Sequence, residues 1–174
     1  MRLIIQVSPD DADILAGMIL IVPRTKAADG VQQYEVRFRH GRTKWKSLHR
    51  TIMQRSLSGQ RIPSNIFVDH INRDPLDNRR ENLRLATARQ NAANRTRKTR
   101  VTSKYNGVYQ RITKNGINWQ ARGSRPNNRG GYTRITIGTF NTENEAALAW
   151  NSWAIKEYDG YANLNVIEDD NAVT

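Results

Sequence analysis

The chain has 174 residues, no cysteine and a formal net charge of +12. The absence of cysteine excludes disulfides and Cys-ligated zinc. No apolar stretch approaches the roughly 18 residues of a membrane span, so no membrane partner is expected. The positive charge instead indicates a polyanionic partner, and the length suits one domain or two small ones.

Residues 1–46 are predicted to form a small sheet that flanks the segment after it. Apolar β-prone runs predict strands over 2–7 and 34–39 and a buried strand within 16–22, and Ser8-Pro9 predicts a helix start. The alternation after residue 34 leaves four side chains as candidate phosphate contacts, with solvated strand charges as the alternative: Arg37, Arg39, Lys44 and Lys46.

The most informative segment runs from 68 to 95. Its pattern predicts a strand that carries Asp69 and His70, a turn-rich loop that leads to Asn82, and a helix that runs from a capping box to about residue 95. Asn91 would lie on the first turns of that helix and face the strand. A carboxylate, an imidazole and an amide oxygen would then converge, in the outline of a one-metal hydrolytic site.

Each of these residues alone has an ordinary structural explanation. An Asp-His pair is usually polar surface, Asn82 alone would be a turn or capping residue, and Asn91 alone an exposed helix position. Their combination and spacing favour a functional site. For His49 two interpretations stay open, because it could approach the site from a preceding helix or could be a packing or phosphate-contacting residue.

Together with the lead-in at 47–53, this segment resembles the ββα-metal motif of HNH nucleases, in the Asp-His…Asn…Asn form of phage homing endonucleases. The resemblance implies that Asp69 and Asn91 bind a divalent cation, that His70 is the general base, and that Asn82 braces the loop between the strands. Many HNH nucleases carry a His at the position of Asn91, so the resemblance implies weaker metal binding here.

The chemistry of phosphodiester hydrolysis suits these residue types. An imidazole, with a reference pKa near ~6.5, is mostly neutral at physiological pH and can take a proton from the attacking water. Ligands that offer only oxygen favour Mg²⁺, with Mn²⁺ as a substitute, over zinc. No small-molecule cofactor is expected.

Basic charge is concentrated in the middle of the chain. Residues 37–100 carry a balance of +13 and residues 101–140 a balance of +7, whereas 1–36 and 141–174 carry −2 and −6. Such a distribution is typical of a protein that tracks phosphates. Residues 97–104 are predicted to be a basic linker along the DNA backbone, or else a solubilising tether, and the basic residues in and before it are Arg95, Arg97, Lys98 and Arg100.

Residues 105–165 predict three strands and a helix that opens with a capping box at Thr142 and has Trp150 and Trp153 on its core face. Motifs at 105–108, 137–140 and 160–165 resemble the plant Apetala-type (ethylene-response) DNA-binding domain, whose sheet lies in the major groove. Strand alternation places six candidate DNA-contacting side chains outward: Tyr109, Arg111, Arg122, Ser124, Arg134 and Thr136. An acidic tail follows at 166–174.

The sequence therefore predicts an α+β fold: an HNH nuclease module at 47–96, then a three-stranded antiparallel sheet packed on one helix. The resemblance implies a homing-type, site-specific endonuclease for double-stranded DNA that nicks one strand per monomer, in the cytoplasm of a bacterial host or phage-infected cell. Two alternatives stay open. One is a non-catalytic, sequence-specific DNA-binding regulator. The other is an RNA-binding protein, which is less favoured because the sequence shows no aromatic-rich platform for single strands.

Overall fold

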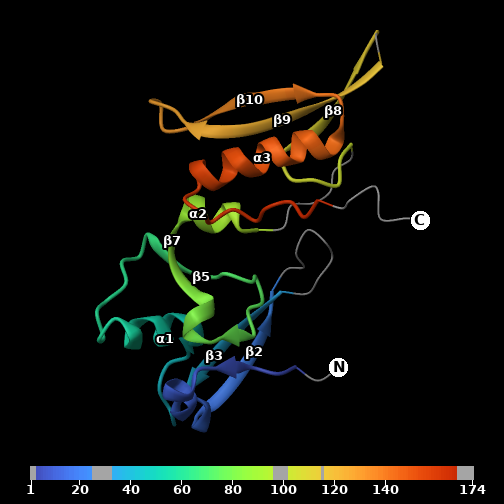
Figure 1. Cartoon of the computed structure of the whole chain (residues 1–174). Helices are drawn as coiled ribbons and strands as arrows, with labels where there is room; N and C mark the ends of the chain where they lie inside the picture. The colour runs from blue at the N-terminus through green and yellow to red at the C-terminus, as the bar shows by residue number, and fades with distance from the viewer. Residues whose placement is uncertain (1–2, 25–32, 96–101, 115, 168–174) are drawn as a thin grey trace, which may run out of the picture. The chain divides into compact units, whose positions relative to one another are not determined.

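The computed structural model describes residues 3–24, 33–95, 102–114 and 116–167 (Figure 1). The chain divides into two compact units, Met1–Thr96 (unit 1) and Arg97–Thr174 (unit 2). Both combine helices with small, mostly antiparallel sheets, which confirms the mixed helix and sheet class. In the described part of the chain, no helix is long and apolar enough to cross a membrane.

Unit 1 begins with an antiparallel sheet of order β2-β3-β4. The strand predicted within 16–22 and the one predicted over 34–39 are both present, and the predicted helix start at Ser8-Pro9 leads into a 3-10 helix. The strand predicted over 2–7 is shorter than expected, since only two of its described residues pair. The elements are β1 (Gln6–Val7), η1 (Pro9–Ala16), β2 (Met18–Pro23), β3 (Tyr34–Arg39), β4 (Lys46–Ser47) and helix α1 (Leu48–Ser56).

The expectation of a buried strand within 16–22 is wrong for half of its side chains. Met18 and Leu20 are exposed, whereas Ile19 between them packs against the core. Successive side chains of a strand point to opposite faces, and the core of unit 1 covers only one face of this sheet. A run of apolar residues hides this alternation, because it contains no polar residue to mark the exposed face.

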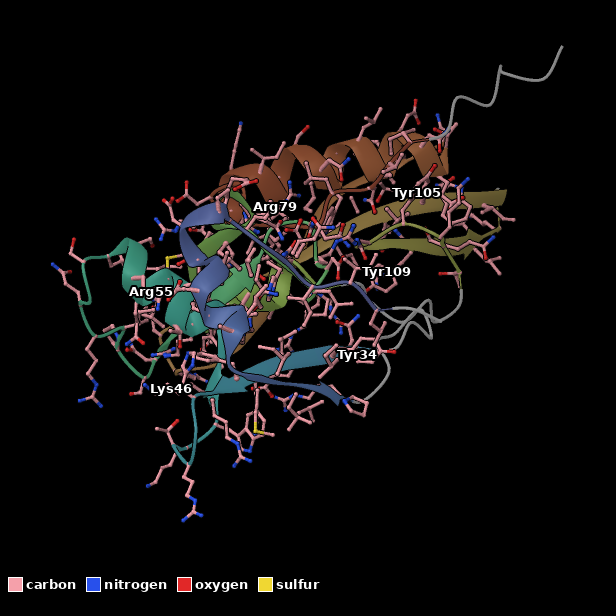
Figure 2. All side chains as sticks on the ribbon, turned by 90° about the horizontal axis from the view of Figure 1, so that it is seen from below. Tyr34, Lys46, Arg55, Arg79, Tyr105 and Tyr109 are labelled. Atoms are coloured by element: carbon pink, nitrogen blue, oxygen red, sulfur yellow. The ribbon has the colours of Figure 1, made fainter. Side chains whose placement is uncertain are left out.

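A single hydrophobic core joins this sheet to the segment that follows it. Its buried members are Ile14, Val36, Phe38, Leu48, Ile52, Met53, Ile62 and Leu83. An ion pair with a buried carboxylate reinforces the junction, since Arg80 donates from Nε and Nη2 to the fully buried Asp11 at 2.6 and 3.0 Å. Figure 2 shows Arg55 on α1 beside η1, where it donates to Asp13 at 2.6 Å. A buried carboxylate is tolerated only when it is paired in this way.

The segment after α1 forms two antiparallel strands and a short helix. Strand β5 (Ile66–His70) pairs with β7 (Leu83–Thr87), and helix α2 (Ala88–Ala93) follows directly. The predicted capping box is confirmed, because Thr87 Oγ1 accepts from Gln90 N and Gln90 Oε1 accepts from Thr87 N. Between the strands lie β6 (Asp77–Asn78), which pairs with β1 in parallel, and the 3-10 turn η2 (Arg80–Asn82).

Unit 2 is a three-stranded antiparallel sheet of order β10-β9-β8, with one helix on one of its faces (Figure 1). The elements are β8 (Val108–Thr113), β9 (Gly116–Pro126), β10 (Tyr132–Phe140) and α3 (Glu143–Glu157). The three predicted strands and the Thr142–Glu145 capping box are confirmed.

The two tryptophans of α3 pack against two glycines, one just before β8 and one in β9. Trp150 is 5 % exposed, as expected of a core residue. A Cβ atom added at Gly107, which has a φ of +71°, would lie 1.9 Å from Trp150 Nε1, and one added at Gly123 would lie 2.3 Å from the Trp153 ring. Both positions therefore require glycine, and this close approach fixes which face of β9 meets the helix.

Candidate active site

Strand β5 holds Asp69 in a buried, fully paired position. The register places Asp69 directly opposite Arg84 of β7, so the two side chains share one face of the two-stranded sheet. Arg84 Nε donates to Asp69 Oδ2 at 3.0 Å, and Asp69 is only 7 % exposed. A guanidinium therefore balances the charge of this carboxylate.

A residue that the sequence analysis did not single out, Asn94, also contacts this carboxylate. It caps the end of α2 and is buried. Its Nδ2 donates to both oxygens of Asp69, at 3.2 and 3.0 Å, and to the backbone carbonyl of His70 at 2.8 Å. One amide thus ties the helix end to both members of the Asp-His pair. The only sequence signal was an Asn three residues after Asn91, on the same helix face.

The imidazole of His70 lies half-buried at the end of β5, next to Asp69. Its Nε2 lies 3.2 Å from Oδ1 of Asn78, a fully buried residue of β6. Burial lowers the pKa of His70 below its usual 6.5, although the hydrogen bond to Asn78 and the nearby carboxylates oppose the shift. The ring is consequently neutral at physiological pH and able to accept a proton.

The structure brings His49 to the same place. It lies in the first turn of α1, and its ring centroid is 5.2 Å from that of His70 in an edge-on arrangement. The Ser47 hydroxyl is 3.1 Å from His49 Nδ1. Burial, followed by the charge of His70, lowers the pKa of His49 to about 4. His49 thus reaches His70 from helix α1 and also packs against its ring, so both interpretations of His49 agree with this position and its role stays a prediction.

Asn82 lies at the end of η2 and connects three parts of the loop. Its Oδ1 accepts from Asn72 N at 3.0 Å, while its Nδ2 donates to Asn72 Oδ1 at 2.9 Å and to the carbonyl of Asp77 at 2.7 Å. All of these bonds lie within the connection between β5 and β7. They are the contacts that a bracing residue would make.

Asn91 lies in the middle of α2 and is half-buried. It is one helical turn before Asn94, so both project from one face, and Asn94 contacts Asp69. A carboxylate and an amide oxygen are hard donors of the kind that Mg²⁺ uses together with waters and substrate phosphate. Among the described residues, no group of three or more His, Cys, Asp or Glu could hold a metal, so a richer ligand set is not formed there.

The four basic residues predicted in the N-terminal sheet have different surroundings. Arg37 is held by Glu35, to which it donates at 3.0 Å, and Arg39 lies 4.7 Å over the ring of Trp45. Lys44 and Lys46 are exposed. Lys44 and Lys46 therefore have the solvent access that a phosphate contact requires. Arg37 would have to break its ion pair with Glu35 before it could bind a phosphate.

The outward residues predicted in unit 2 lie on one face of its sheet. The register pairs Ser124 with Arg134 and Arg122 with Thr136, on the side opposite Gly123 and the helix. On the same face, the Arg122 guanidinium lies 5.0 Å over the Tyr109 ring. Arg111 is exposed on β8, and in unit 1 Arg95 is exposed just after α2. The linker candidates Arg97, Lys98 and Arg100 lie outside the described residues.

Two comparisons with known proteins agree on the central segment. Residues 46–93 match the family model described as HNH endonuclease. An uncharacterized HNH endonuclease of Acanthamoeba polyphaga mimivirus is 34% identical over 152 residues, which are 85% of this chain and 71% of the viral protein. No solved structure matches the chain significantly.

Proposed function

We propose that this protein is a metal-dependent nuclease that cleaves double-stranded DNA at a specific site. The proposal proceeds from the family, since the chain belongs to the HNH endonucleases. The observation that carries this proposal is the cluster at the end of β5. There Asp69, His70 and the end of α2 are held together by the three hydrogen bonds of Asn94.

In this proposal His70 is the general base. Its neutral imidazole takes a proton from a water molecule, the water oxygen attacks the phosphorus, and the 3′ oxygen of the cleaved bond leaves and takes up a proton. The products are a 5′-phosphate and a 3′-hydroxyl. A positioned base of this kind contributes roughly 10²–10⁴-fold to the rate. Burial of His70, which lowers its pKa, keeps the base unprotonated at neutral pH.

Asp69 and Asn91 are the residues that we propose as ligands of a divalent cation. Such a cation, Mg²⁺ or Mn²⁺, would stabilise the negative charge that develops on the phosphate and on the leaving oxygen. Asn82 braces the β5–β7 connection through its bonds to Asn72 and Asp77, so that His70 and Asp69 keep their positions.

We further propose that the outer face of the sheet in unit 2 reads the DNA sequence, as in the Apetala-type domains. Arg can recognise guanine through two hydrogen bonds, and Arg122 and Arg134 project from this face. Residues 101–140 contain no acidic residue, so nothing on these strands repels the phosphates. Because each chain would carry one such site, a bound monomer would nick one strand.

A supercoiled-plasmid assay tests the proposal. The full chain should convert supercoiled DNA to the open circle in Mg²⁺, and it should leave the DNA intact in EDTA. Mapping the nicks on a long DNA would then separate a site-specific enzyme from a nonspecific one. If the chain binds DNA but produces no nick in Mg²⁺ or Mn²⁺, it is a DNA-binding protein without catalysis, and the proposed nuclease activity is wrong.

A further inference from the structure

The two ring nitrogens of His70 have different environments. Nε2 lies 3.2 Å from Oδ1 of Asn78. The other atom of that amide, Nδ2, donates to the carbonyl of Pro75 at 3.1 Å. This second bond determines which way the amide is turned, because a flipped amide would place two oxygens against each other at Pro75. An amide oxygen can only accept, so Nε2 of His70 must carry the proton.

We propose that Asn78 is a positioning residue that fixes His70 as the Nε2–H tautomer, so that Nδ1 is the atom that accepts the proton from the attacking water. The inference deepens the proposed function, since it rests on His70 being the base. A neutral imidazole offers one donor and one acceptor nitrogen, and the partner of the donor decides which is which.

Asn78 is itself held firmly enough for this role. It is fully buried, and its backbone lies in β6, which pairs with β1 so that Asn78 is opposite Val7. The Pro75 carbonyl fixes its amide. A buried side chain with both ends of its amide paired has little freedom to turn, so it can impose an orientation on the ring that bonds to it.

His49 restricts the same ring by packing. Its ring lies edge-on to His70 at 5.2 Å, and Ser47 holds it in place. Because the pKa of His49 is lowered to about 4, this neighbour is neutral at physiological pH and puts no positive charge beside the base. His70 is thus held by a hydrogen bond at Nε2 and by an aromatic contact to its ring.

The tautomer can be read directly from the protein without metal or DNA. The chain contains three histidines, so the full-length protein labelled with ¹⁵N-histidine gives a simple long-range ¹⁵N–¹H spectrum in EDTA. Spectra of H40Q and H49Q identify the remaining ring. We expect His70 to show a protonated Nε2 and an unprotonated Nδ1. A wild-type spectrum with the proton on Nδ1 would overturn the proposal, whatever the outcome of the plasmid assay.

Two substitutions separate positioning from general stability. Asn78→Leu has nearly the same shape but no acceptor, and it should give a mixture of His70 tautomers, while the ring of His40 in the same sample stays unchanged. Asn78→Asp keeps an acceptor oxygen toward Nε2 of His70 but loses the donor to the Pro75 carbonyl, so a folded Asn78→Asp protein should retain the Nε2–H form. If Asn78→Leu does not fold, the wild-type and Asn78→Asp spectra still decide the tautomer.

Activity gives the second readout. Loss of the imposed orientation in Asn78→Leu should lower the single-turnover rate of nicking about 10- to 100-fold, as misplacement of a reacting group does. DNA affinity in EDTA should stay within about twofold, because Asn78 is fully buried and offers no surface to DNA. A folded Asn78→Asp protein should recover most of the rate. A folded Asn78→Leu with an unchanged tautomer or an unchanged rate would show that Asn78 does not position the base.

Discussion

Asn94→Ala should destabilise unit 1 although Asn94 is not proposed to touch metal or DNA. The substitution removes an amide that donates to both oxygens of Asp69 and to the carbonyl of His70. A hydrogen bond to a charged group contributes about 1.5–3 kcal/mol and one to a neutral carbonyl about 1 kcal/mol. Since the Asp69 carboxylate is buried and cannot turn to water, we expect a loss of about 3 kcal/mol.

Asn91→Ala is the matched control, because it removes the same side chain one turn earlier on the same helix. Asn91 is half-buried, and alanine is the better helix former, so its stability should change by less than about 0.5 kcal/mol. The two variants should separate further in activity, since Asn91 is the proposed metal ligand.

Hydrogen exchange measured by mass spectrometry on the full chain in EDTA gives the test. Peptides that cover β5 and β7 should lose about 3 kcal/mol of protection in Asn94→Ala, which is roughly a hundredfold faster exchange. Peptides of unit 2 serve as the internal reference. Unchanged protection of β5 in Asn94→Ala, or a larger loss in Asn91→Ala, would show that the amide of Asn94 does not hold the Asp-His pair.

Other measurements test the remaining assignments. His70→Ala should lower plasmid nicking by about 10²-fold or more with nearly unchanged DNA binding. Full activity in this variant would show that His70 is not the general base. Asp69→Ala and Asn91→Ala should both shift the Mg²⁺ titration of nicking to higher concentration, Asp69→Ala more strongly because it also removes a charge, and superimposed curves would refute the ligand assignment. The pKa of His49 is about 4 in the folded chain and near ~6.5 in the unfolded chain. As the pH falls, His49 therefore binds a proton in the unfolded state before it does so in the folded state. The free energy of unfolding measured in urea should therefore decrease from about pH 6.5 toward pH 4. His49→Gln should reduce this pH dependence, and an unchanged dependence would show that the pKa of His49 is not lowered. Arg122→Ala should relax base preference at one position of the mapped site by about 1–3 kcal/mol, whereas a uniform loss across all sequences would indicate a phosphate contact.

Elements whose signals lie close together in the chain were predictable from the sequence. The capping boxes at Thr87–Gln90 and Thr142–Glu145 are made by side chains three residues apart, so no distant part of the chain has to be known to locate them. The strand that carries Asp69 and His70 follows from flanking β-prone residues, and the structure has it as β5. The spacing of Asp-His, Asn82 and Asn91 likewise needs only the linear order of residues.

Burial was harder to predict, because it depends on what covers each face. The apolar run that became β2 has no alternation to show that Met18 and Leu20 face outward, and only the one-sided packing of the sheet against its core decided it. Asp11 gave no sign of being the buried partner of Arg80, which lies 69 residues later in the chain. An ion pair of that separation depends on how the N-terminal segment folds back, and local residue preference carries no information about it.

The contacts that define the site also belong to tertiary structure. The sequence by itself identified Asp69 and His70, because their neighbours and spacing are local properties. It did not identify Asn94 or Asn78, although both supply hydrogen bonds to the pair. Asn residues are common in turns and at helix ends, so their residue type distinguishes nothing. Only the register of β5 with β7, and the pairing of β6 with β1, bring one amide to the carboxylate and another to the imidazole.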